Sequence, residues 1–366
     1  MHNYSQNQEE NIPYMKRTNV KKKKRSSKAS LIIKVALLLV ASLLICVTAY
    51  GVYITKQAEH AANSAHEVLE GRDVSALREE KVEPVNDNVS ILFVGVDDSE
   101  NRGQGSENSR SDALILATLN NTTKTIKMLS IPRDSYVYIP SVGYKDKITH
   151  AHALGGTLST IETVEQLFDV PIDYYVRMNF NAFIDVVDAL GGIEAEVPYA
   201  LHEKDEFDRN TINLKPGLQH LNGSQALALA RTRKQDSDIQ RGIRQQEILT
   251  AITNKVASVD SITKYDDVIK AIGDNMKTNM TFSEMKSFLS YLTKGKPRID
   301  SLTLEGNDDM STGVYYYQLD QQSVDDVSEI LNNHLARKKS SSALTNSNTD
   351  TDNAAGDDRS TNESAQ

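Results

Sequence analysis

The sequence predicts an α/β domain that is preceded by a single transmembrane helix. Three short apolar runs, 91–96, 113–119 and 125–131, are bounded by turn residues and are typical of strands buried inside a sheet. Segments with helical periodicity follow from residue 157 onwards, with further strand-like segments between them. A separate apolar run of 24 residues, 31–54, contains a single charged residue, Lys34. We therefore expect one folded α/β domain after one membrane span.

The apolar run 31–54 is long enough to cross a membrane. At ~1.5 Å per helical residue it spans the ~30 Å hydrocarbon core with some tilt. A cleaved secretory signal has an apolar stretch of only ~7–15 residues, so we predict an uncleaved signal anchor. Residues 1–30 hold eight Lys or Arg against two Glu, and basic flanks stay in the cytoplasm. The sequence thus predicts a single-pass, type II cell-membrane protein with a cytoplasmic N-terminus and an extracellular domain.

Composition divides the chain into five predicted segments. The stretch after the membrane span is rich in Ala, Glu, Lys and His without a strong apolar face, and the C-terminal stretch has too few large apolar residues to fold. The segments are a cytoplasmic basic tail at 1–30, the transmembrane signal-anchor helix at 31–54, an extracellular helical stalk at 55–85, the folded domain at 86–337 and a disordered polar tail at 338–366.

The distribution of charge argues against a nucleic-acid-binding protein. The formal net charge is −9, and because residues 1–30 alone carry +6, the remainder carries −15. The part that folds is therefore acidic, and it would repel a nucleic acid. The single cysteine, Cys46, lies in the apolar segment, so no disulfide or thiolate metal site can form within one chain.

Charged side chains stand where the three predicted strands end or begin. Asp97 follows the first strand, Arg110 and Asp112 open the second, and Arg133 follows the third. If the three strands are neighbours, these four side chains gather at one rim of the sheet, where ligands of sheet proteins usually bind. Each of them alone is more simply explained as a solvated turn residue. Their recurrence at consecutive strand ends favours a site.

The residue types at this rim indicate a phosphate ligand and a metal ion. Carboxylates suit Mg²⁺ or Mn²⁺, which take one or two of them together with phosphate oxygens of the substrate. Arginine guanidinium groups bind phosphate oxygens in a bidentate way. We therefore predict a site for a phosphate ester or a diphosphate with a bridging metal ion.

A second group of arginines follows an apolar helical segment. Arg231 and Arg233 share a face only if the chain between them is extended, whereas Asp238, Arg241 and Gln245 share a face of a helix. A basic surface balanced by nearby acids would explain a lone arginine. Several arginines in an otherwise acidic domain favour a site for a multiply charged anion, in which the arginines repel one another when the site is empty. The histidines at 150 and 152 lack metal-ligand spacing and are interpreted as loop residues.

The remaining pattern predicts alternating strands and helices. The segment 144–151 is expected to be a loop, and 193–208 to hold short strands at most. Strand-like segments lie at 172–180, 301–304 and 314–317, and helical segments at 157–168, 181–190, 222–230, 236–257, onwards to 292, and 323–335.

Several motifs in this order resemble the LytR–CpsA–Psr family of bacterial cell-wall enzymes. They are ILFVGVDD, RSDALILATLN, SIPRDSYVYIP, KITHAHALGG, DYYVRMNF, ALGGIEAEVP, LNGSQALALARTRK and RGIRQQEIL, and they cover residues 88–257 continuously. The resemblance implies one extracellular domain of three layers, a central mixed β-sheet flanked by helices, with an apolar cavity for a lipid chain. It also implies transfer of an anionic glycopolymer, such as wall teichoic acid or capsular polysaccharide, from a polyprenyl-diphosphate carrier to peptidoglycan in a Gram-positive-type envelope.

The resemblance assigns roles to individual residues. Asp97 and Asp112 match the aspartates that the family associates with Mg²⁺ (or Mn²⁺), and together with Arg110 and Arg133 they are the expected catalytic residues. The expected diphosphate-binding residues are Arg110, Arg133, Arg231, Arg233, Arg241, Gln245 and Lys147. Lys147 stands in the family's Lys-Ile-x-His-Ala segment, where this chain has Thr149 in place of a common Asn.

The expected reaction is a Mg²⁺-dependent phosphotransfer. A sugar hydroxyl of peptidoglycan attacks the phosphorus nearest the first sugar of the polymer, and polyprenyl phosphate leaves. Asp97, Asp112 and Asp134 are all candidates for the group that takes the proton. Two alternatives remain open at this point: a hydrolase that uses water as acceptor, and a non-catalytic membrane-anchored regulator or polyprenyl-lipid-binding protein.

Overall fold

The computed structural model describes residues 28–84, 86–97, 109–205, 209–235, 237–258, 275–293 and 296–336. Two compact units are formed by Met1–Ile54 and Thr55–Gln366. Helix α1, Lys28–Ala65, contains the predicted span, and among the described residues it alone is long and apolar enough to cross a membrane. The predicted tail 338–366 and nearly all of the tail 1–30 lie outside the described residues.

The centre of the second unit is a six-stranded mixed sheet, as expected. Its strand order is β11-β6-β1-β2-β3-β12. The three strands predicted at the start of the domain are neighbours: β1 pairs antiparallel with β2, and β2 with β3. Strand β6 runs parallel to β1, β12 parallel to β3, and β11 antiparallel to β6. The bounds are β1 Val89–Val96, β2 Ser111–Asn120, β3 Thr125–Ser130, β6 Tyr174–Met178, β11 Met276–Thr278 and β12 Arg298–Leu302.

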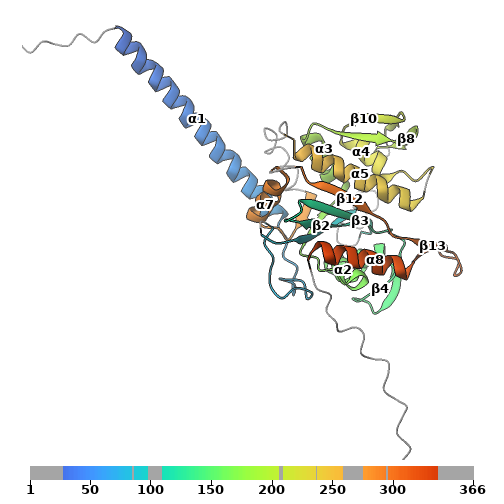
Figure 1. The fold of residues 1–366 in the computed structure, drawn as a ribbon. Helices are drawn as coiled ribbons and strands as arrows, with labels where there is room; N and C mark the ends of the chain where they lie inside the picture. Colours follow the sequence, from blue (N-terminus) through green and yellow to red (C-terminus); the bar gives the residue numbers. More distant parts are fainter. Residues whose placement is uncertain are drawn as a thin grey trace, which may run out of the picture. The chain divides into compact units, whose positions relative to one another are not determined.

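Helices cover both faces of this sheet and complete the three layers (Figure 1). On one face, Leu92, Leu116 and Leu129 form a core with helices α2, Ile148–Phe168, and α8, Gln321–His334. On the other face, alternate residues such as Ile91 and Met128 meet α7, Phe282–Thr293, and Leu249 of α5, Asp238–Val256. The two-residue alternation along each strand therefore builds two separate cores.

A third core lies beside the sheet. Helices α3, Phe180–Ala189, and α4, Gly223–Arg231, pack with α5 against four short strands. These strands form two hairpin-like pairs, β7 Ile193–Val197 with β10 Gly217–Leu221, and β8 Leu201–Lys204 with β9 Thr211–Leu214. Helix α4 begins at a capping box in which the side chains of Asn222 and Gln225 bond to each other's backbone N–H. The predicted helices 181–190, 222–230 and 236–257 are confirmed within a few residues, whereas part of the helical pattern expected before 292 lies at 259–274, outside the described residues.

The segment 144–151, predicted as a loop, is ordered as a strand and a helix. Strand β5, Tyr144–Lys147, pairs with β4, Tyr136–Ile139, and α2 begins directly after it rather than at residue 157. Two adjacent glycines, Gly155 and Gly156, have non-helical backbone angles inside α2. Because they interrupt the helix, the hydrophobic periodicity did not predict its first turns. The two histidines interpreted as loop residues therefore lie on α2, where the Nδ1 atom of the buried His152 contacts the carbonyl of Ser109.

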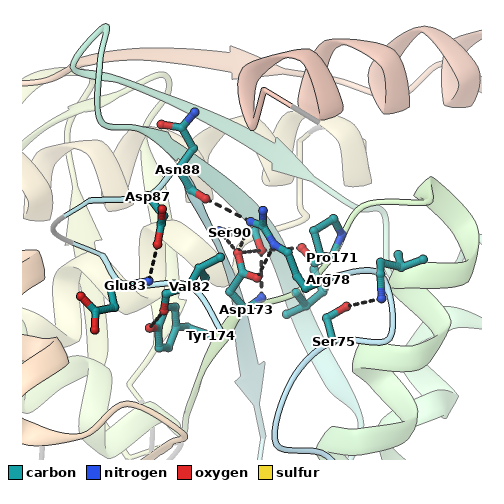
Figure 2. A network of polar contacts seen from close by, with 12 residues as sticks. Ser75, Arg78, Val82, Glu83, Asp87, Asn88, Ser90, Pro171, Asp173 and Tyr174 are labelled. Atoms are coloured by element: carbon teal, nitrogen blue, oxygen red, sulfur yellow. Dashed lines mark hydrogen bonds and ion pairs between the residues drawn. The ribbon is translucent and has the colours of Figure 1, made fainter. Parts of the chain in front are cut away.

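The segment 55–85, predicted as a stalk, belongs to the same compact unit as the sheet, which begins at Thr55. Helix α1 ends at Ala65, and Ala58, Ala62 and Ala65 are buried on one side of its last turns. The chain beyond it is held by Arg78, whose guanidinium group donates to both carboxylate oxygens of Asp173, as Figure 2 shows. The buried face of α1 consists of alanines, which give only a weak apolar signal, and the Arg78–Asp173 ion pair gives no apolar signal. The hydrophobic pattern of the sequence therefore did not predict that this segment packs on the domain.

The Arg78–Asp173 pair should contribute substantially to stability. Asp173 is nearly buried and also accepts from the backbone N–H of Ser90, so Arg78→Ala leaves a buried carboxylate without its cation. We expect the free energy of unfolding to fall by about 3 kcal/mol. The matched control is Lys81→Ala, which removes an exposed lysine from its pair with Glu284 and should cost no more than about 1 kcal/mol. Urea denaturation of the full chain in detergent measures both, and equal losses would contradict this account.

Candidate functional site

A cavity of about 860 Å³ lies against the second face of the sheet. Its floor consists of alternate strand residues, among them Ile91, Phe93, Ile115 and Met128. Helices α3, α4, α5 and α7 and the last turns of α1, through Ala58 and Ala62, contribute the remaining walls. These walls are apolar apart from Asn179, Thr253, Lys286 and the polar end described below. A space of this size and lining suits a long apolar ligand.

One end of the cavity is lined by the charged residues at the strand ends. Asp97 follows β1, Arg110 and Asp112 stand at the start of β2, and Arg133 follows β3. The antiparallel pairing of β1, β2 and β3 brings these ends to the same rim of the sheet, as expected from the sequence. The predicted residues Arg231, Arg233, Arg241 and Gln245 line the same cavity.

The second arginine group is fixed by the junction of α4 and α5. Arg231 is the last residue of α4, and Thr232 has extended backbone angles of φ −59° and ψ 141°, so Arg231 and Arg233 both reach the cavity. Arg244 holds this turn by donating from Nη2 to the carbonyl of Thr232 at 2.6 Å. The sequence predicted that Arg231 and Arg233 share a face only if the chain between them is extended, and the structure has this extended chain.

Helix α5 approaches the sheet closely because residue 242 is glycine. A Cβ atom at Gly242 would overlap with the side chain of Ser130 at the end of β3. The neighbouring residues Arg241 and Gln245 are thereby held beside the rim, and both line the cavity. Gln245 also donates from Nε2 to the carbonyl of Ala230 at 3.2 Å, which ties α5 to α4.

The electrostatic environments of Arg133 and Arg241 are different. Burial lowers the pKa of Arg133, but the charges of Asp112 and Asp134 outweigh it and leave the pKa above its ordinary value. Arg133 forms an ion pair with Asp112 through Nη1. Burial lowers the pKa of Arg241 to about 10, and repulsion from Arg233 and Arg133 adds to the effect of burial while Asp238 opposes it. Repulsion between arginines therefore contributes to the lowered pKa of Arg241, whereas attraction to Asp112 and Asp134 determines the raised pKa of Arg133.

Lys147 lies behind the rim and is absent from the described residues that line the cavity. Its Nζ atom donates to Asp134 Oδ1 at 2.8 Å, and Asp134 in turn contacts Arg133. Burial raises the pKa of Asp134, but the hydrogen bond from Lys147 and the charge of Arg133 bring it below the ordinary value. The structure thus connects Lys147 to the predicted diphosphate site through Asp134, not by direct exposure to the cavity.

The carboxylates at the rim suit a metal ion whose coordination shell is completed by oxygen atoms of the substrate. Asp97 and Asp112 both line the cavity, and Asp97 is buried. Within the described residues there is no group of three or more His, Cys, Asp or Glu side chains that could enclose an ion alone. Mg²⁺ is commonly bound through one or two carboxylates together with phosphate oxygens and water, so the residue types at this rim suit it. Asp98, beside Asp97, lies outside the described residues.

Sequence reasoning missed Phe180 as a residue of the site. Its ring lies 4.5 Å from the guanidinium carbon of Arg231, and both residues line the cavity. Stacking on an aromatic ring orients an arginine without removing its hydrogen-bond donors. No local signal marks it, because Phe180 reaches the rim beside Asp97 only through the parallel pairing of β6 with β1.

The contrast between Arg133 and Arg241 predicts opposite effects on stability. Arg133→Gln should lower the free energy of unfolding by about 1–3 kcal/mol, because Asp112 loses its cation and Asp134 keeps only Lys147. Arg241→Gln should leave it unchanged or raise it, because a buried and repelled charge is removed. Urea denaturation of the full chain, with and without inorganic pyrophosphate, measures these changes. Pyrophosphate should stabilise the unmodified chain more than either variant, and changes of equal sign and size would contradict the assignment.

The chain is similar to known proteins over most of its length. The model of the LytR_cpsA_psr family matches residues 51–333. The chain is 40% identical to the polyisoprenyl-teichoic acid–peptidoglycan teichoic acid transferase TagT of Bacillus subtilis (strain 168), over 87% of this chain and 98% of that protein. It is 35% identical to the transferase TagU of the same strain, over 87% of this chain and 100% of that protein.

Solved structures of the same relatives share the fold. TagT bound to LIIa-WTA superimposes with a TM-score of 0.63 and 38% identity, covering 74% of this chain and 100% of that one. The family protein YwtF (TagT) with bound octaprenyl pyrophosphate lipid gives a TM-score of 0.59 and 35% identity, with 74% and 100% covered. From the match of the family model and from these relatives, the chain belongs to the LytR–CpsA–Psr family.

Proposed function

We propose that this protein transfers an anionic glycopolymer, a wall teichoic acid or a capsule-type polysaccharide, from a polyprenyl-diphosphate carrier to peptidoglycan. The observation that carries the proposal is the continuity of one cavity, in which apolar walls lead to a rim of arginines and aspartates. The names of the relatives support the reaction, since TagT and TagU are teichoic acid transferases. The bound octaprenyl pyrophosphate in the structure of YwtF (TagT) supports the carrier.

Each half of the cavity suits one half of the carrier. The polyprenyl chain lies against the apolar face of the sheet, where residues such as Ile115 and Met128 offer no polar group. The diphosphate lies at the rim, where Arg133 and Arg241 bind its oxygens and Arg231 is held in place by Phe180. Burial makes these charge interactions stronger than they would be in water.

The proposed chemistry is a single phosphoryl transfer. The acceptor hydroxyl oxygen forms a new P–O bond to the phosphorus nearest the polymer, and the bridging P–O bond of the diphosphate breaks. Polyprenyl phosphate leaves with the bonding electron pair, and the hydroxyl proton passes to a base, for which Asp97 at the rim is the best-suited candidate. Asp112 and Asp134 are less suited, because Arg133 forms an ion pair with each of them and Lys147 also donates to Asp134.

Asp97 and Asp112 are the residues that would hold a Mg²⁺ or Mn²⁺ ion. When bound, the ion neutralises charge on the phosphoryl oxygens. The chain's own contribution is to align the diphosphate with arginines and to exclude water from the apolar part of the cavity. Phosphoryl transfer needs this alignment and charge neutralisation more than covalent assistance from the protein.

A transfer assay tests the proposed function and the metal requirement. The full chain in detergent is incubated with a labelled polyprenyl-diphosphate-linked glycan, with and without peptidoglycan oligomers, Mg²⁺ and EDTA. We expect Mg²⁺-dependent label on peptidoglycan, and roughly tenfold to a hundredfold lower turnover for Asp97→Asn, because one metal ligand is lost. The matched control is Glu194→Gln, an exposed carboxylate on β7 outside the cavity lining, which should be fully active.

Other results of this assay would replace the proposal. Release of the glycan into water, equally fast without peptidoglycan, would identify a hydrolase. Binding of the lipid diphosphate without any product would identify a lipid-binding or regulatory protein. EDTA-resistant transfer by the chain and by the Asp97→Asn variant would exclude the metal.

We further propose that the N-terminus is cytoplasmic and that residues 55–336 lie outside the cell. The basic residues 21–25 precede the apolar segment, and the proposed acceptor is extracellular. Protease added to intact, wall-stripped cells should digest the large unit and leave an N-terminal epitope protected. Digestion of the large unit only after lysis would show the opposite orientation.

A further inference from the structure

Two β-hairpins meet directly beyond the rim of the cavity. The first consists of β4 and β5, and the second of β13, Gly306–Asp309, with β14, Tyr316–Leu319. They are joined because the backbone N–H of Tyr317 donates to the carbonyl of Asp134 at 2.9 Å, and Ser135 forms a bridge with Tyr317. Asp134 follows Arg133, so both hairpins are attached to the residue that closes the rim.

Tyrosines and lysines gather where these hairpins meet. Tyr136 and Tyr138 of β4 lie opposite Lys147 and Lys145 of β5, and residues paired in this way share a face of the hairpin. Tyr316 of β14 meets Tyr136 edge-on with ring centroids 4.7 Å apart. The Nζ atom of Lys147 lies 5.7 Å and 5.6 Å from the ring centroids of Tyr315 and Tyr316. We call this set, Tyr136, Tyr138, Tyr315 and Tyr316, the tyrosine platform.

The tyrosine platform is accessible and is continuous with the rim. Tyr138 is 42% exposed, and Tyr136, Tyr315 and Tyr316 are half-buried. No platform tyrosine is among the described residues that line the cavity, so a lipid chain inside would leave the rings free. Lys147 contacts the platform on one side and Asp134 on the other, and Asp134 contacts Arg133. The platform therefore starts two side chains away from the proposed diphosphate site.

We propose that the tyrosine platform binds the glycan of the acceptor and presents its hydroxyl group to the diphosphate. This inference rests on the proposed transfer and names the surface that the acceptor uses. A sugar ring has an apolar C–H face and a hydroxyl edge, and a tyrosine offers the complementary pair of an apolar ring and a polar O–H. Rings on neighbouring strands can contact successive sugars of one strand of glycan.

The charges around the tyrosine platform favour the acceptor over the donor polymer. Strand β13 and the residue before it contribute Glu305, Asp308 and Asp309, against Lys145 and Lys147 on β5. The hydroxyl of Tyr315 donates to Asp308, which keeps this carboxylate at the platform. An anionic polymer would be repelled by such an edge, whereas an uncharged amino-sugar chain would not.

The experiment uses the full chain in detergent and compares Tyr138→Ala and Tyr316→Ala with Tyr144→Ala. Tyr144 is also an exposed tyrosine of the same hairpin, but it pairs with the buried Ile139 and so belongs to the opposite face. Two measurements are made: calorimetric affinity for chitotetraose, an uncharged amino-sugar tetramer, and the KM values of the transfer assay for peptidoglycan oligomers and for the lipid-linked donor. Tyr138→Phe retains the ring and serves as the conservative variant.

We expect Tyr138→Ala and Tyr316→Ala to weaken chitotetraose binding and to raise the acceptor KM by about threefold to tenfold, as expected for loss of one aromatic contact. The donor KM should remain unchanged in both variants. Tyr144→Ala and Tyr138→Phe should leave the chitotetraose affinity and both KM values unchanged. The proposal would be overturned if Tyr144→Ala weakened chitotetraose binding as much as Tyr138→Ala and Tyr316→Ala do, or if chitotetraose binding were unchanged in all variants. A raised donor KM with an unchanged acceptor KM would assign the platform to the donor polymer instead. If the unmodified chain binds chitotetraose but transfers nothing, the proposed function fails, and the calorimetric comparison still tests the platform.

Discussion

The ion pair between Arg133 and Asp112 is the contact on which the arrangement of the site depends. Asp112 opens β2 and Arg133 closes β3, so the pair fastens two neighbouring strand ends at the mouth of the cavity. Arg133 also contacts Asp134, whose carboxylate holds Lys147 and whose carbonyl holds β14. One guanidinium group therefore connects the sheet, the cavity and both hairpins. Its charge is retained because the two carboxylates more than compensate for its burial.

The two faces of the central sheet differ because one is filled and the other is hollow. Helices α2 and α8 pack on the first face with fully buried residues such as Leu116, Ile161 and Leu331. The opposite face encloses about 860 Å³ of apolar space. Protein interiors are normally close-packed, and an apolar space that stays dry binds apolar ligands favourably. The closely packed face keeps the sheet rigid, and the cavity on the other face has room for the lipid chain of the carrier.

The sequence predicted the three central strands and the charged residues at their ends because those features depend on local signals. The short turn at Asn120 and Asn121 requires β2 and β3 to be adjacent, and the polar residues at strand ends then coincide. The pairing of β6 with β1 depends on residues about 80 positions apart, and no local pattern encodes it. For this reason Phe180, at the end of β6, was not recognised as the partner of Arg231.

Other differences arose where hydropathy is a poor guide. The packing of the segment 55–85 on the domain was missed because its contacts are made by alanines and by ion pairs such as Arg78–Asp173. The first turns of α2 were missed because Gly155 and Gly156 interrupt the helix. The position of Lys147 behind Asp134 could not be inferred from its motif, because the motif gives the residue type and not the direction of its side chain.

The rim, the hairpins and the walls of the cavity are made from different kinds of structure. Wall residues such as Ile115 and Met128 also belong to a hydrophobic core, so a change of shape there disturbs folding. The tyrosines and acidic residues of the hairpins stand on exposed strands and turns that tolerate replacement. Over evolutionary time the surface proposed to receive the acceptor glycan can therefore change its sequence while the cavity proposed to hold the lipid carrier keeps its shape.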